Sequence, residues 1–131
     1  MPVELEMVLR VLLAMALGAI VGFQRGKAEK PAGLRDIILI CGGAALFTVV
    51  SVQGFGADPA RVAAGIVTGI GFLGAGAIIR RGEGVVKGLT TAATIWVAAG
   101  IGIAAGAGLY IIATVSTFLV LAVLLLPRLS E

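Results

Sequence analysis

The last third of the chain constrains the fold most, because it is a long apolar stretch without a single charge. From Leu89 to Leu126 there are 38 residues and no Asp, Glu, Lys or Arg. One membrane-spanning helix needs about 20 residues, so this stretch predicts two spans, over 89–105 and 109–126. Gly106 and Gly108 mark the expected turn between them, since glycine is favoured where a helix ends.

Three further apolar runs precede this stretch and predict spans over residues 5–23, 37–55 and 62–79. The composition agrees, because 60% of the residues are hydrophobic and only 13% are charged, against about 45–50% and about 25% in soluble domains. A soluble domain of this length cannot bury so much apolar surface. The chain is therefore predicted to be a single transmembrane domain over residues 1–131, an all-α integral membrane protein with a bundle of about five transmembrane helices.

The basic residues predict how the helices are oriented. Eight of the ten fall on one side of the predicted membrane, and only Arg10 and Arg61 fall on the other. Lys and Arg are retained on the cytoplasmic side, so the N-terminus is expected outside and the C-terminus inside. The first run lacks a basic start and is followed by more spans, so we expect a retained helix in a multi-pass protein of the bacterial inner membrane. The eight residues on the cytoplasmic side are Arg25, Lys27, Lys30, Arg35, Arg80, Arg81, Lys87 and Arg128.

The reactive side chains exclude most catalytic chemistry. The chain has no histidine and one cysteine, Cys41, so imidazole chemistry and an internal disulfide are both excluded. The acidic residues all lie near span ends or in loops, and none lies at the middle of a predicted span, where ion-pathway residues are found. We therefore predict no enzyme activity, no catalytic residue, no cofactor, no metal site and no nucleic-acid partner. Cys41 is expected to be a small packed residue.

Glycine is concentrated in the second half of the chain, where 12 of the 20 glycines lie between residues 65 and 108. Small residues four apart allow two helices to approach closely in lipid, and a homo-oligomer through such a face is expected. Four glycines within eight residues weaken a helix by about 1 kcal/mol each, so that segment predicts either tight helix contact or an irregular helix around a cavity. The spaced pairs are Gly18/Gly22, Gly65/Gly69 and Gly102/Gly106, and the dense segment holds Gly69, Gly71, Gly74 and Gly76.

The densest charge cluster surrounds Arg25, Arg35 and Asp36. One interpretation is a solvated loop that sets the topology and attracts anionic lipid. The other gives each arginine a structural or recognition role at a helix end, where a guanidinium pairs with Asp36 or with backbone carbonyls.

Other polar candidates lie in the fourth apolar run. Thr90 and Thr91 either bond their own backbone or a neighbouring helix, or they line a solute pathway. Trp96 is expected to be packed with one hydrogen bond from its indole N–H, with a binding pocket as the alternative.

Taken in order along the chain, five motifs resemble the MgtC/SapB family, over about residues 5–126. They are Gly18-x-x-x-Gly22-x-x-Arg25; Lys30-Pro-Ala-Gly-Leu-Arg35; Gly42-Gly-Ala-Ala-Leu-Phe47; Gly69-Ile-Gly-Phe-Leu-Gly-Ala-Gly76; and Gly88-Leu-Thr-Thr-Ala-Ala-Thr-Ile-Trp96. The resemblance implies an inner-membrane protein of about five spans, linked to growth under magnesium limitation and to survival inside host cells. It also implies roles for Arg25, Arg35, Thr90, Thr91 and Trp96 and for the segment 69–76.

The function that this resemblance implies is regulation, by binding a membrane partner such as the F-type ATP synthase. The alternatives are a transporter or channel for magnesium or another small solute, and a purely structural or lipid-organising protein. Three positions depart from the pattern that the resemblance leads us to expect: Gln24 and Gly26 replace acids, and Asp36 replaces a threonine. The acidic residue expected to pair with the basic residues of the first loop is therefore expected at a different position in the sequence. The soluble C-terminal domain of many family members is expected to be absent.

Overall fold

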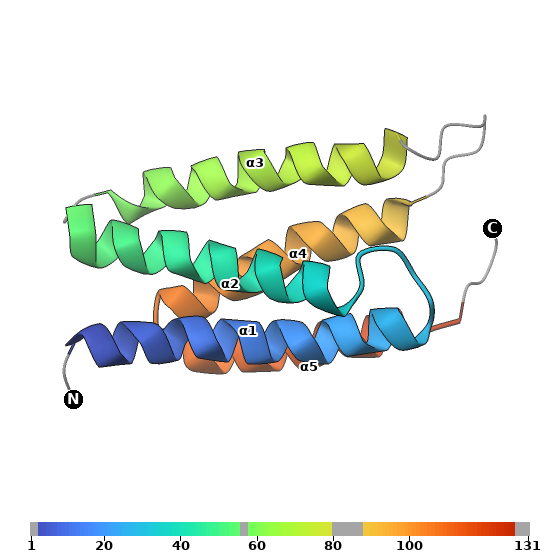
Figure 1. The fold of residues 1–131 in the computed structure, drawn as a ribbon, viewed down its shortest axis with the longest axis horizontal. Helices are drawn as coiled ribbons and strands as arrows, with labels where there is room; N and C mark the ends of the chain where they lie inside the picture. Colours follow the sequence, from blue (N-terminus) through green and yellow to red (C-terminus); the bar gives the residue numbers. More distant parts are fainter. Residues whose placement is uncertain (1–2, 56–57, 80–87, 128–131) are drawn as a thin grey trace.

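The computed structural model is a bundle of helices, and it describes residues 3–55, 58–79 and 88–127 (Figure 1). These residues contain five α-helices and no strand, which confirms the all-α prediction. The helices are α1 (Val3–Lys27), α2 (Leu34–Val50), α3 (Pro59–Ile79), α4 (Leu89–Gly106) and α5 (Tyr110–Leu124), and a π-helical turn, η1 (Ser51–Phe55), continues α2.

Four of these helices, α1 to α4, are long and apolar enough to cross a membrane. Helix α5 is apolar but has 15 residues, which gives about 22 Å against a hydrocarbon core of about 30 Å. Consecutive helices alternate in direction, so α1 begins and α5 ends at opposite ends of the bundle (Figure 1). Arg80, Arg81, Lys87 and Arg128 lie outside the described residues, and the N-out orientation stays a prediction.

The predicted turn between α4 and α5 is confirmed. Gly108 has φ +85°, a left-handed conformation that favours glycine. The Leu109 N–H donates to the Ala104 carbonyl at 2.9 Å, and the Gly108 N–H donates to the Ala105 carbonyl at 3.1 Å. These two bonds form a Schellman motif, which satisfies the last carbonyls of α4 and reverses the chain.

The core of the bundle is the crossing of α1, α2 and α4 at Cys41, which is fully buried. A Cβ at Gly18 of α1 would lie 3.0 Å from the Cβ and Sγ of Cys41, and a Cβ at Gly102 of α4 would overlap the Cys41 carbonyl oxygen. The thiol donates to the Ala98 carbonyl at 3.3 Å. Two of the three predicted glycine pairs, Gly18/Gly22 and Gly102/Gly106, therefore pack against α2 within the chain, and Cys41 is the small packed residue that was expected.

Helix α3 stands apart from this core. Only 6% of its apolar window is buried, compared with 33%, 44% and 56% for α1, α2 and α4. It packs mainly on α4 and touches α2 little. Most of α3 is therefore left for lipid or for another molecule to cover.

Candidate functional site

A buried arginine joins three parts of the chain at the end of the bundle where α1 ends and α2 begins. Arg25, in the last turn of α1, has 2% of its surface exposed. Its Nη2 donates to the Pro31 carbonyl at 2.7 Å and to the hydroxyl oxygen of Thr91 on α4. Since a buried charge is costly unless it is hydrogen-bonded, these bonds make Arg25 a connector between α1, the 28–33 loop and α4.

The local sequence brings the loop to Arg25. Gly22, one turn earlier on α1, lies so close to α2 that a Cβ there would be 2.7 Å from the Leu34 Cα. The Lys30 N–H donates to the Arg25 carbonyl at 2.9 Å, and Ala32 has φ +56°. A left-handed alanine costs about 1–2 kcal/mol, and the hydrogen bond from Arg25 to the neighbouring Pro31 helps to hold the loop in this shape.

The two arginines of the predicted cluster differ in the structure. The structural role is supported for Arg25, whereas Arg35 and Asp36 are both exposed. No ion pair joins Arg35 to Asp36 in the described part of the chain, so for Arg35 the interpretation of a solvated loop fits better than pairing with Asp36.

The threonines also differ. The Thr94 hydroxyl donates to the Thr90 carbonyl at 2.7 Å, and the Thr68 hydroxyl donates to the Ala64 carbonyl at 3.1 Å, so each of these two threonines bonds the backbone of its own helix. Thr90 is exposed. Thr91 is buried and its hydroxyl accepts a hydrogen bond from Arg25. Of Thr90 and Thr91, Thr91 is therefore the residue that connects helices.

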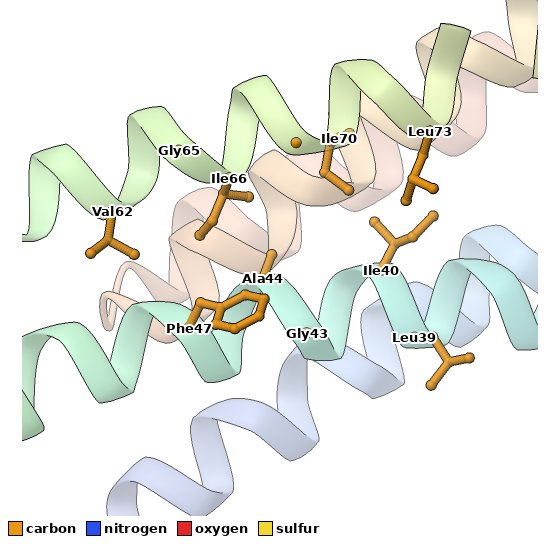
Figure 2. A pocket seen from close by; sticks show the side chains of 11 residues that line it. Leu39, Ile40, Gly43, Ala44, Phe47, Val62, Gly65, Ile66, Ile70 and Leu73 are labelled. Atoms are coloured by element: carbon orange, nitrogen blue, oxygen red, sulfur yellow. The ribbon is translucent and has the colours of Figure 1, made fainter. Parts of the chain in front are cut away.

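A pocket of about 700 Å³ adjoins the buried arginine. Its wall includes Thr91 and the loop residues Pro31 and Ala32, and Asp36 is the one charged residue of the wall within the described part of the chain. A second hollow of about 570 Å³ lies between α2 and α3 (Figure 2), and the two share Leu39, Ile40 and Leu73. We call the two together the α2–α3 groove.

The dense glycine segment does not pack tightly within the chain. A Cβ at Gly69, Gly71 or Gly76 would meet nothing within 4 Å, and only Gly74 approaches a neighbour, Ala92, at 3.5 Å. Helix α3 also runs unbroken through the segment. The expected tight contact is therefore absent inside the chain, and so is the irregular helix. Gly69 and Gly76 instead line the α2–α3 groove.

The position of Trp96 also differs from the prediction. It lies on the outside of α4 with 59% of its surface exposed, so the prediction of a packed indole is wrong. Its indole N–H donates no hydrogen bond within the described residues, and Trp96 lines neither part of the groove.

A polar cluster that was not predicted from the sequence lies at the opposite end of the bundle. Arg10 donates to Glu6 at 2.6 Å, to the Tyr110 hydroxyl at 3.0 Å and to the Gly106 carbonyl at 3.0 Å. The i,i+4 spacing of Glu6 and Arg10 at the start of an apolar run was the available signal. This cluster ties α1 to the turn between α4 and α5.

Metal ligands are sparse in the described residues, where no group of three His, Cys, Asp or Glu side chains could hold an ion. Over residues 3–55, 58–79 and 88–127 the arrangement of the site is structural and apolar, with one buried cation and one carboxylate at the rim of the groove.

The long apolar helices, the glycine-mediated core and the buried arginine define a helical membrane protein. The chain matches the MgtC family over residues 11–131 and belongs to that family, as the motif resemblance indicated. No solved structure matches it.

Three curated relatives illustrate the match. MgtC of Salmonella typhimurium strain LT2 is 46% identical over 121 residues, which cover 92% of this chain and 52% of MgtC. The protein named "Putative magnesium transporter YhiD" of Escherichia coli K12 is 46% identical over 130 residues, covering 90% of this chain and 60% of YhiD. SrpB of Synechococcus elongatus is 40% identical over 129 residues, covering 88% of this chain and 71% of SrpB. The chain thus spans little more than half the length of MgtC and YhiD.

Proposed function

We propose that this protein is a non-enzymatic regulator of the bacterial inner membrane that acts under magnesium limitation by binding another membrane protein. In this proposal α5 completes five spans, with the N-terminus outside and the C-terminus inside. The family membership and the distribution of basic residues support it.

The observation that carries the proposal is the exposure of α3, which has 6% of its apolar window buried. Its outer face, turned away from the α2–α3 groove, presents small exposed residues three or four apart along the helix. Such a face allows a second helix to approach closely in lipid. The residues are Ala60, Ala64, Thr68 and Gly71.

The F-type ATP synthase is the partner we propose, and its support is the family resemblance. A second copy of this chain is the other candidate for the same face, as a homo-oligomer. Both candidates use helix packing and need no catalytic group.

Replacing Gly71 with leucine is expected to weaken partner binding while the chain folds normally, because a Cβ at Gly71 meets nothing within 4 Å. The tagged protein would be purified from membranes in mild detergent, and the co-purified ATP synthase and the oligomer size would be measured. We expect about a tenfold loss of the bound partner, the ratio that 1.4 kcal/mol produces.

Gly69→Leu is the matched control, since Gly69 has equal space but lines the groove on the inner side of α3. Equal losses for both variants, or no loss for Gly71→Leu, would contradict binding through the outer face.

A magnesium transporter is the second candidate, and the observation that favours it is the pocket shared by Asp36 and Thr91. Their oxygens are of the type that Mg²⁺ prefers. Purified protein in liposomes with a magnesium-sensitive dye tests it. Saturable flux that disappears in Asp36→Asn would overturn the regulator proposal, whereas the absence of flux from folded protein would exclude transport.

A further inference from the structure

The α2–α3 groove runs along one part of the bundle and has a definite length. On α2 its lining extends from Asp36 to Phe47, and on α3 it extends from Val62 to Ala77. At 1.5 Å per residue these segments measure about 17 Å and about 22 Å. The hydrocarbon core of a bilayer is about 30 Å thick, so the groove has roughly the depth of one leaflet and is short for a complete spanning helix.

The lining excludes water and favours hydrocarbon. In the deeper part every lining side chain is apolar or absent, and Ile66, Ile70 and Leu73 of α3 point across toward Ile40 and Ala44 of α2 (Figure 2). Water in a cavity needs two to four polar partners per molecule, which this lining lacks. An empty gap of about 570 Å³ would cost the wall its dispersion contacts. A flexible hydrocarbon chain fits both conditions.

As far as the described residues line it, the groove becomes polar at one end only. Asp36, in the first turn of α2, lines it there, and Thr91 lies on the opposite wall. Arg35, which directly precedes Asp36, and Lys30, six residues before it, are both exposed. The N-terminus of α2 has no side-chain cap, so its N–H groups add to a positive potential beside the carboxylate.

From these observations we infer that the α2–α3 groove binds one phospholipid with a primary ammonium in its headgroup, phosphatidylethanolamine. One acyl chain lies between α2 and α3, the ammonium donates to Asp36, and the phosphate lies beside Arg35, Lys30 and the start of α2. A headgroup with both charges suits this end of the groove, because a carboxylate and basic residues stand side by side. The inference does not depend on the proposed regulator function, since the outer face of α3 is left free.

The acyl-chain site is tested by filling it. Gly69→Phe places a ring in the groove where a Cβ meets nothing within 4 Å. Gly71→Phe is the matched control on the same helix, with equal space but outside the groove lining. The full chain would be purified in mild detergent, exposed to phosphatidylethanolamine, and analysed by native mass spectrometry for retained lipid.

We expect one retained lipid per chain in the unmodified protein and in Gly71→Phe, and loss of that lipid in Gly69→Phe. Equal retention in all three proteins would overturn the site. Loss of a co-purified partner protein from Gly69→Phe, with lipid retention unchanged, would assign the groove to a partner helix instead.

The headgroup preference is tested separately with phosphatidylcholine of the same acyl chains, whose trimethylated ammonium cannot donate a hydrogen bond. The unmodified protein is expected to prefer phosphatidylethanolamine by up to about fivefold, the upper end of the range for an exposed ion pair. Asp36→Asn should abolish the preference, whereas Asp58→Asn, an exposed acid at the start of α3 outside the groove lining, should keep it. An unmodified protein that retains both lipids equally would refute the ammonium contact with Asp36.

Discussion

Arg25→Ala is expected to lower the free energy of unfolding by about 1.5–3 kcal/mol, the range for losing hydrogen bonds to a charged group. The loss follows because the Pro31 carbonyl and the Thr91 hydroxyl lose their shared donor in a buried place. The loop that carries Ala32 in a left-handed conformation also loses one of its supports. Unfolding by denaturant in detergent micelles, followed by helical circular dichroism, measures the change.

Lys27→Ala is the control, since Lys27 lies two residues further along α1 and is exposed. We expect its effect to stay within about 0.5 kcal/mol. Arg25→Lys should recover only part of the stability, because an ammonium lacks the planar fork of donors. If Arg25→Ala and Lys27→Ala behaved alike, Arg25 would be no more than a topology charge.

Gly102→Ala and Gly100→Ala are expected to change stability in opposite directions. A Cβ at Gly102 would overlap the Cys41 carbonyl oxygen and lie 2.8 Å from the Ala44 Cβ, so α4 must move away from α2. We expect a loss of about 1–3 kcal/mol, the usual cost of overpacking. A Cβ at Gly100 meets nothing within 4 Å, and alanine there should stabilise the helix by up to about 1 kcal/mol.

The free energies of unfolding of the two variants, measured under identical conditions, test whether their stabilities change in opposite directions. Since both replace glycine by alanine in the same helix, two residues apart, helix propensity cancels and the remaining difference reports contact with α2. A stabilised Gly102→Ala protein would mean that α2 and α4 are not in close contact at Cys41.

The helical fold could be predicted from the sequence because lipid imposes simple requirements on length and charge. An apolar run of about 20 residues is needed for a span, and the stretch from Leu89 to Leu126 had to be divided in two. The position of the turn followed from Gly108, which adopts the left-handed conformation that a helix end requires.

The contacts between helices could not be predicted in the same way. Gly65/Gly69 has the same spacing as Gly102/Gly106, yet only the second pair packs against α2. In a membrane protein the lipid-facing surface is as apolar as the core. The glycine spacing therefore predicts a packing face but not the helix that packs against it. Trp96 was misplaced for this reason, because nothing in its apolar surroundings distinguishes the core from the lipid-facing surface.

The role of Arg25 was left open by the sequence because its decisive partner is distant. Pro31 is six residues away, but Thr91 is 66 residues away and becomes a neighbour only through the packing of α4. Gly22 was the local indication, since close approach of α1 and α2 is what buries the guanidinium.

The position of α3 in the chain has a consequence for biogenesis. It lies between α2 and α4 in sequence, whereas α2 and α4 pack directly on each other through Cys41 and Gly102. Synthesis proceeds from the N-terminus, so the hairpin of α1 and α2 enters the membrane with one face uncovered until α4 emerges. A nascent chain arrested after α3 would expose that face to the insertion machinery, and full-length protein would complete its core only when Thr91 reaches Arg25.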